Sequence, residues 1–315
     1  MTTARTSPRP GPLSRLGGWL DRTTPSLLVA NVVAQAALIA TGGLVRLTKS
    51  GLGCSKAWYC EEGSLVPTNV EPGEIQPYIE FGNRVVVVFL ALIAGTLAIA
   101  VWRTRPRLRA LGLVPFAGVV AQAVLGASLV NHELPPLLVG IHMVISVTLV
   151  WASMQLLLRW KGAPPLASGR GLAALRWASL ALFATLTVLG TFTTGTGPHS
   201  GDDVAVRLDF DPATVARLHS LSVWAFAATV AAIAWIMWRR LPSAAPTATP
   251  AATSPATHAA RLALAYLLGV IVVQGAIGYI QYATDRPIGW VFLHLVGIGA
   301  LTAAHGAAFH LTRRA

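Results

Sequence analysis

Eight stretches of this chain are each long enough and apolar enough to cross a lipid bilayer as a helix, which takes about 20 mostly apolar residues. The stretches fall at residues 27–45, 85–101, 111–129, 137–158, 177–194, 215–238, 262–283 and 288–309. A backbone surrounded by lipid must satisfy its own hydrogen bonds, so apolar runs of this length predict helices. The expected fold is therefore an all-α polytopic membrane protein with eight transmembrane helices.

The distribution of charge predicts how the helices are oriented. Only 11% of the 315 residues are charged, which excludes an ordinary soluble enzyme, a disordered chain and a nucleic-acid-binding arm. Seventeen of the 24 Lys and Arg lie in the tails and in the loops 102–110, 159–176 and 239–261, together with a single acid, Asp21. The other eleven acids lie on the opposite side. Basic loops stay in the cytoplasm, so we expect a multi-pass cell-membrane protein with both termini cytoplasmic.

The two halves of the chain share a pattern. Gln122 precedes His142 by 20 residues, and Gln274 precedes His294 by the same 20. A parallel repeat of this kind predicts two tandem, pseudo-symmetric four-helix bundles. The expected divisions are a cytoplasmic tail 1–25, a first half 26–160, a cytoplasmic loop 161–176 and a second half 177–310 that includes a flexible cytoplasmic linker 241–260.

Three histidines lie at similar depth near the outer ends of apolar runs: His142, His219 and His294. Asn83 holds the equivalent position in the second run. Polar residues inside a membrane are costly and usually functional. Two histidines that face each other across a bundle form a bis-imidazole haem site, which we predict for His219 and His294. The alternative is two separate histidines that are each hydrogen-bonded to a helix, and a zinc site would need further ligands.

The positions of four other histidines do not indicate a haem site. His305 and His310 lie near the basic inner end of the last run and are expected to be interfacial. His132 and His199 fall in outer loops and are expected to be exposed.

The first outer loop and the start of the second run carry further candidates. Cys54 and Cys60 face an oxidising compartment, which favours a disulfide, although a redox-active pair is the alternative. Glu80 and Arg84 are four residues apart, so the simplest interpretation is an ordinary helical ion pair. Beside a haem, the arginine could hold a propionate and the glutamate could handle protons.

Together these residues resemble the haem A synthase family, whose members convert haem O to haem A. The resemblance covers nearly the whole chain and is clearest in the segments 41–48, 51–54 and 274–294. It implies haem b held between His219 and His294, with haem sites toward the outer side of the membrane. It also implies a substrate haem O site in the first half, with Glu80 as the catalytic residue.

The family motif on the second run is Glu-x-x-His-Arg, which Glu80 and Arg84 match and Asn83 does not. The resemblance thus implies that His142, Arg84 and Asn83 bind the substrate haem. We hypothesise that His142 alone binds the iron there and that one axial face stays open. The resemblance also implies a haem O synthase (protohaem farnesyltransferase) as upstream partner, and a quinol or other membrane electron carrier, within the membrane lipid.

Two other functions fit part of the pattern. A non-catalytic dihaem cytochrome b that relays electrons would explain the paired histidines but not Glu80 or the asymmetry at Asn83. A small-solute transporter would explain the repeat and the polar groups inside the membrane, but it would bind no haem.

Overall fold

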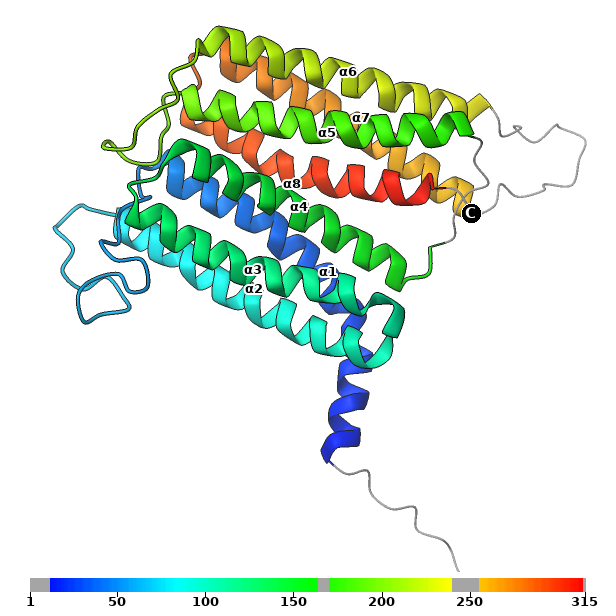
Figure 1. The fold of residues 1–315 in the computed structure, drawn as a ribbon, viewed down its shortest axis with the longest axis horizontal. Coiled ribbons are helices and arrows are strands. Elements are labelled where there is room, and N and C mark those ends of the chain that lie inside the picture. The colour runs from blue at the N-terminus through cyan, green and yellow to red at the C-terminus, as the bar shows by residue number, and fades with distance from the viewer. Residues whose placement is uncertain (1–11, 164–169, 240–254, 314–315) are drawn as a thin grey trace, which may run out of the picture.

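The computed structural model describes residues 12–163, 170–239 and 255–313, and all long elements in these ranges are helices (Figure 1). The helices are α1 (Pro12–Leu47), α2 (Gln76–Thr104), α3 (Arg109–Asn131), α4 (Pro136–Trp160), α5 (Arg170–Thr196), α6 (Pro212–Arg239), α7 (Pro255–Ala283) and α8 (Ile288–Leu311), with a 3-10 turn η1 (Pro106–Leu108) before α3. Eight helices of the described ranges are long and apolar enough to span a membrane. The predicted all-α class with eight spans is confirmed.

Seven of the eight helices begin before their apolar runs, and three begin within the tail, loop and linker of the expected divisions. α5 starts at Arg170, within the predicted loop 161–176. α1 starts at Pro12, within the predicted tail, and its first turns project from the bundle in Figure 1. α7 starts at Pro255, within the predicted linker 241–260. Proline is favoured in the first turn of a helix because its missing N–H has no partner there anyway. Residues 241–254 of the linker lie outside the described residues.

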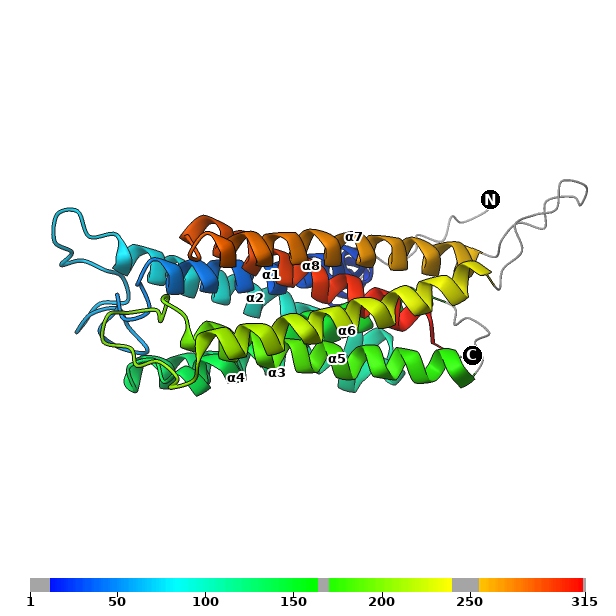
Figure 2. The same cartoon turned by 90° about the horizontal axis from the view of Figure 1, so that it is seen from above.

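The helices pack in two groups that meet along α8. α1, α2, α3 and α4 contact one another in sequence, and α4 also contacts α1. α5 packs on α6, and α7 packs on α8. α8 lies in addition against α1 and α4 of the first group, as Figures 1 and 2 show. We call the end that carries the loops 48–75, 132–135, 197–211 and 284–287 the outer end, and the opposite end the inner end.

Small residues allow α8 to approach its neighbours closely. A Cβ atom added to Gly299 would lie 2.9 Å from the Cβ of Ala36 on α1. A Cβ atom at Gly306 would lie 3.3 Å from Met154 and 3.4 Å from Trp151, both on α4. In a membrane, where lipid competes equally for apolar surface, such close backbone approach is a main source of helix association. Gly299 and Gly306 therefore let α8 pack closely against α1 and α4.

Buried hydrogen bonds join the same helices toward the inner end. Asn31 Nδ2 on α1 donates to Ser153 Oγ on α4 at 2.8 Å. Gln155 Nε2 on α4 donates to the Gly306 carbonyl on α8 at 2.7 Å, and its Oε1 pairs with His310 Nδ1 at 3.1 Å. Each polar bond between membrane helices contributes only about 0.6–2 kcal/mol, so it is the set of them that joins α1, α4 and α8 here.

The prediction that His305 and His310 are interfacial is wrong, because both side chains are only 1% exposed. The His305 ring stacks on Phe183 of α5, with 4.6 Å between ring centroids. Its Nε2 lies 3.3 Å from the Ser179 hydroxyl. Both histidines thus belong to the packed interior, and the neighbouring arginines instead cap the end of α8: Arg176 and Arg313 donate to its last carbonyls.

We expect Gly299→Leu to destabilise the protein by about 1–3 kcal/mol, because the added side chain would push α8 away from α1. Gly269→Leu on α7 is the matched control, since no heavy atom lies within 4 Å of a Cβ atom there. Thermal unfolding of the detergent-solubilised protein would measure the difference. Equal melting temperatures for the two variants would contradict the close α1–α8 contact.

Candidate functional site

The four even-numbered helices each present one candidate residue at nearly the same depth. Asn83 and His219 are seven residues past the first residues of α2 and α6, Gln76 and Pro212. His142 and His294 are six residues past the first residues of α4 and α8. At about 1.5 Å per residue, these positions are roughly 9–10 Å from the outer helix ends. The common depth expected from the sequence is present in the structure.

In the second half, His219 is oriented as a metal-binding imidazole would be. Its Nδ1 lies 2.9 Å from the Leu186 carbonyl on α5, which leaves Nε2 as the free nitrogen. A second-shell hydrogen bond of this kind fixes the tautomer and the orientation of a ligating imidazole. On α8, Nδ1 of His294 is buried and has no hydrogen-bond partner among the described residues, so this ring is also available to a ligand. These residues fit a bis-imidazole haem site.

In the first half, neither ring nitrogen of His142 bonds to a described residue, and Nδ1 is buried. A buried imidazole without a partner is uncommon in a folded protein. The backbone of His142 is well fixed, because Gln122 Nε2 donates to its carbonyl at 2.8 Å and to Ser146 Oγ at 2.6 Å. The ring is thus held at a defined place with its bonding capacity unused, which fits an axial ligand.

A glycine of the preceding helix faces each of the three imidazoles. A Cβ atom would lie 3.9 Å from His142 Cε1 at Gly126, 3.2 Å from His219 Cε1 at Gly190 and 3.5 Å from His294 Cε1 at Gly278. Gly126 and Gly278 follow Gln122 and Gln274 by four residues. The Gln-x-x-x-Gly part of the internal repeat therefore places a glycine against a histidine ring in both halves. The role of Gly190 was not predicted, because no shared motif marks it.

Asn83 differs from the histidines in its partner. Thr41 Oγ1 on α1 donates to Asn83 Oδ1 at 2.7 Å, and no described residue accepts a hydrogen bond from Asn83 Nδ2. Thr41 lies in the segment 41–48 that carries much of the family resemblance, but the sequence did not indicate its contact with Asn83.

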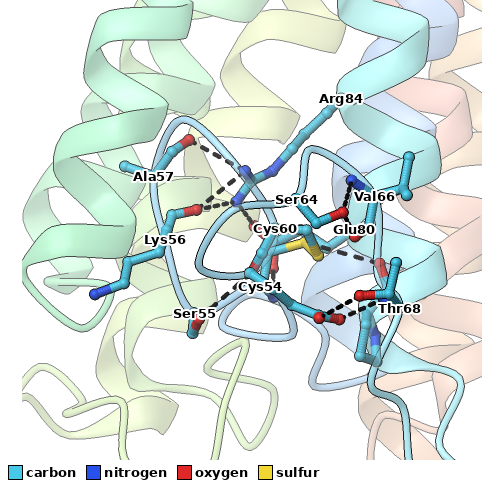
Figure 3. Close-up of a disulfide and its surroundings, with 12 residues drawn as sticks. Cys54, Ser55, Lys56, Ala57, Cys60, Ser64, Val66, Thr68, Glu80 and Arg84 are labelled. Atoms are coloured by element: carbon cyan, nitrogen blue, oxygen red, sulfur yellow. Dashed lines mark hydrogen bonds and ion pairs between the residues drawn. A yellow bond between two sulfur atoms is a disulfide. The ribbon is translucent and has the colours of Figure 1, made fainter.

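Glu80 lies at the start of α2, is only 6% exposed, and is tied to the first outer loop (Figure 3). Its Oε2 accepts the backbone N–H of Cys54 at 2.7 Å, and its Oε1 is paired with Arg84. Arg84 also donates to the carbonyls of Lys56 and Ala57, each at 3.1 Å. The expected ion pair is present, and it also anchors the loop.

The loop itself is closed by a Cys54–Cys60 disulfide. The two cysteines are 0% and 1% exposed, which favours a structural bridge over a redox-active pair. Farther along, the Glu61 carboxylate accepts hydrogen bonds from Thr68 and Asn69. The Asn69 N–H and the Thr68 hydroxyl hold the pKa of Glu61 below its usual value. The loop is therefore fixed at several points above the first half.

The outer loops of the two halves are also joined. Arg46 on α1 donates through Nε to the His199 carbonyl at 2.6 Å and through an Nη to the Thr194 carbonyl at 3.0 Å. His199 Nε2 lies 2.9 Å from the Arg286 carbonyl, so this histidine is half-buried and not the exposed side chain expected. His132 is exposed, as expected. Arg46 has no carboxylate partner among the described residues, which leaves it suited to an anionic ligand group.

These side chains do not gather into a conventional metal cluster. Within the described ranges, no three His, Cys, Asp or Glu side chains lie close enough together to hold a metal ion. A single imidazole in the first half and a pair in the second instead suit iron whose other ligands come from a planar macrocycle.

Comparison with known proteins supports this interpretation. Residues 26–198 match the COX15-CtaA family of cytochrome oxidase assembly proteins. Heme A synthase of Lysinibacillus sphaericus (strain C3-41) is 31% identical over 122 residues, which is 38% of this chain and 39% of that protein. Heme A synthases of Bacillus mycoides (strain KBAB4) and Bacillus cereus (strain AH187) are each 33% identical over 119 residues, 37% of either chain.

The chain thus spans about two fifths of the length of the curated relatives that it matches. The family match includes Glu80, Asn83, Arg84 and His142, whereas His219 and His294 lie beyond it. Because this match covers more than half of the 315 residues, the chain belongs to the cytochrome oxidase assembly protein family.

Proposed function

We propose that this protein is a haem A synthase, which oxidises a ring methyl group of haem O to a formyl group by two successive hydroxylations and loss of water. The observation that carries the proposal is the buried Glu80 carboxylate, held by Arg84 and the Cys54 N–H in the same half as the unpartnered His142. Relatives named heme A synthase support it. A pure electron carrier would need no such carboxylate.

In this proposal, the second half would hold the resident haem b through His219 and His294. The Leu186 carbonyl keeps the His219 ring in the orientation that presents Nε2. Bound haem supplies the iron and porphyrin redox chemistry. His219 and His294 lie at about the same helix depth as His142, and bound haem b would supply electron exchange with a membrane carrier such as a quinol.

The first half provides the substrate site. His142 on α4 would bind the iron of haem O, and Asn83 on α2 would lie at the same haem without binding its iron, so that one face of the iron stays free of a protein ligand. Glu80 accepts or returns a proton at its carboxylate as the methyl group is oxidised, and Arg84 keeps that carboxylate in place. Four of the five Arg84 N–H groups donate to the loop and Glu80, which leaves its Nε–H for a propionate. The Arg46 N–H groups that do not donate to His199 or Thr194 are also left.

Sidedness and partners follow from the same proposal. Basic loops at the inner end place both termini in the cytoplasm, so the haem sites lie toward the outer side of the cell membrane. The substrate is lipophilic and reaches the site through the membrane from an upstream haem O synthase (protohaem farnesyltransferase). The domain division follows the two halves, 26–160 for the substrate and 177–310 for haem b.

We expect Glu80→Gln to lower haem A formation by about 10²–10⁴-fold, because the amide can still accept the Cys54 N–H but can no longer exchange a proton. Co-expression with a haem O synthase in a host that lacks haem A, followed by mass analysis of extracted haems, would measure it. Glu74→Gln is the control, since Glu74 is exposed in the same loop. Haem A at the wild-type level in Glu80→Gln would contradict the catalytic role.

We expect His219→Ala and His294→Ala each to abolish the low-spin bis-imidazole spectrum of the purified protein, because each removes one axial ligand of haem b. His132→Ala, which removes an exposed loop histidine, serves as the control and should leave the spectrum unchanged. Reduced-minus-oxidised optical spectra report the outcome. A spectrum that survives both helix variants would place haem b elsewhere.

A further inference from the structure

The two halves differ at one pair of facing positions. On α6, His219 faces Gly190 of α5, whereas on α2, Asn83 faces Thr41 of α1. Asn83 and His219 occupy the same step of their helices, seven residues from the first residue. The second half thus has a large side chain, His219, opposite a glycine. At the corresponding place, the first half has a smaller side chain, Asn83, opposite a threonine.

The His219 ring needs a glycine at position 190 for steric reasons. A Cβ atom at Gly190 would lie 3.2 Å from His219 Cε1 and 3.5 Å from its Nδ1. The first of these distances is tighter than ordinary van der Waals contact, and a threonine would add two further heavy atoms beyond the Cβ. The absence of a side chain at Gly190 is therefore what lets the ring reach the Leu186 carbonyl, four residues earlier on α5.

Hydrogen bonding explains what the other pair does. The Thr41 hydroxyl donates to Asn83 Oδ1 at 2.7 Å, which turns the amide oxygen toward α1. The amide nitrogen is left as a donor without an acceptor among the described residues. An amide N–H can donate a hydrogen bond to a small ligand, but it has no lone pair to give to iron.

We propose that Thr41 and Asn83 act as one unit that keeps the α2 side of the substrate site free of an imidazole ligand. Thr41 is a positioning residue. Its side chain occupies the space that an imidazole at position 83 would need, and its hydroxyl holds the Asn83 carboxamide so that the NH₂ group is free to donate. The inference rests on the proposed function, because it assigns this side of the first half to the open axial face of the substrate haem.

The test compares Asn83→His with Thr41→Gly/Asn83→His in the purified, haem-loaded full chain. Optical and electron paramagnetic resonance spectra report low-spin bis-imidazole haem. We expect Asn83→His alone to leave the low-spin haem at about one equivalent per chain, and the double variant to raise it to about two. In the double variant, the new histidine ring would donate to the Ala37 carbonyl, just as the His219 ring pairs with the Leu186 carbonyl. If Asn83→His alone gives the full second signal, Thr41 does not control the ligand set.

A reciprocal variant in the second half tests the same idea even where the double variant fails to fold. We expect Gly190→Thr to displace His219 and to abolish the existing low-spin signal. Gly171→Thr on the same helix is the control, because no heavy atom lies within 4 Å of a Cβ atom there. An intact low-spin signal in Gly190→Thr would overturn the proposal.

The wild-type spectrum separates failure of this inference from failure of the proposed function. If the wild-type protein binds no haem in either half, the proposed function fails. If it shows a low-spin haem that His294→Ala removes, while the Thr41 and Gly190 variants behave like their controls, only the inference about Thr41 and Asn83 fails.

Discussion

An imidazole can be buried in a helical bundle only where a neighbouring helix leaves room for its ring, and for His142, His219 and His294 that room comes from a glycine of the preceding helix. Gly126, Gly190 and Gly278 each lie against one histidine ring. The same packing requirement explains part of the sequence repeat, because Gly126 and Gly278 each follow a glutamine by four residues.

The two ends of the bundle use different interactions. Toward the inner end, α8 is held by close glycine contacts and by Gln155, whose amide bonds to both Gly306 and His310. At the outer end, the halves are joined through loops, with Arg46 reaching the carbonyls of residues 194 and 199. The site residues lie between these two sets of bonds, which join α4 to α8 toward the inner end and α1 to the second half at the outer end.

Much of the fold follows from the sequence, because apolar length alone identifies eight spans. The burial of His305 and His310 does not follow, since a helix that is apolar all round carries no sign of which face meets its neighbours. The pairing of His219 with His294 was predicted from depth and spacing, whereas the contact of Thr41 with Asn83 joins residues 42 positions apart and depends on how α1 is rotated. Loop contacts such as Arg46 to His199 carry no sequence pattern at all.

The bond between Gln155 and α8 has a consequence for the order of biosynthesis. α4 is made early and α8 is the last of the described helices to emerge, because membrane proteins are synthesised from the N-terminus. Until α8 inserts, the Gln155 amide lacks both of its partners on that helix, the Gly306 carbonyl and the His310 ring. The first half is therefore complete in sequence but unfinished in packing while the second half is translated.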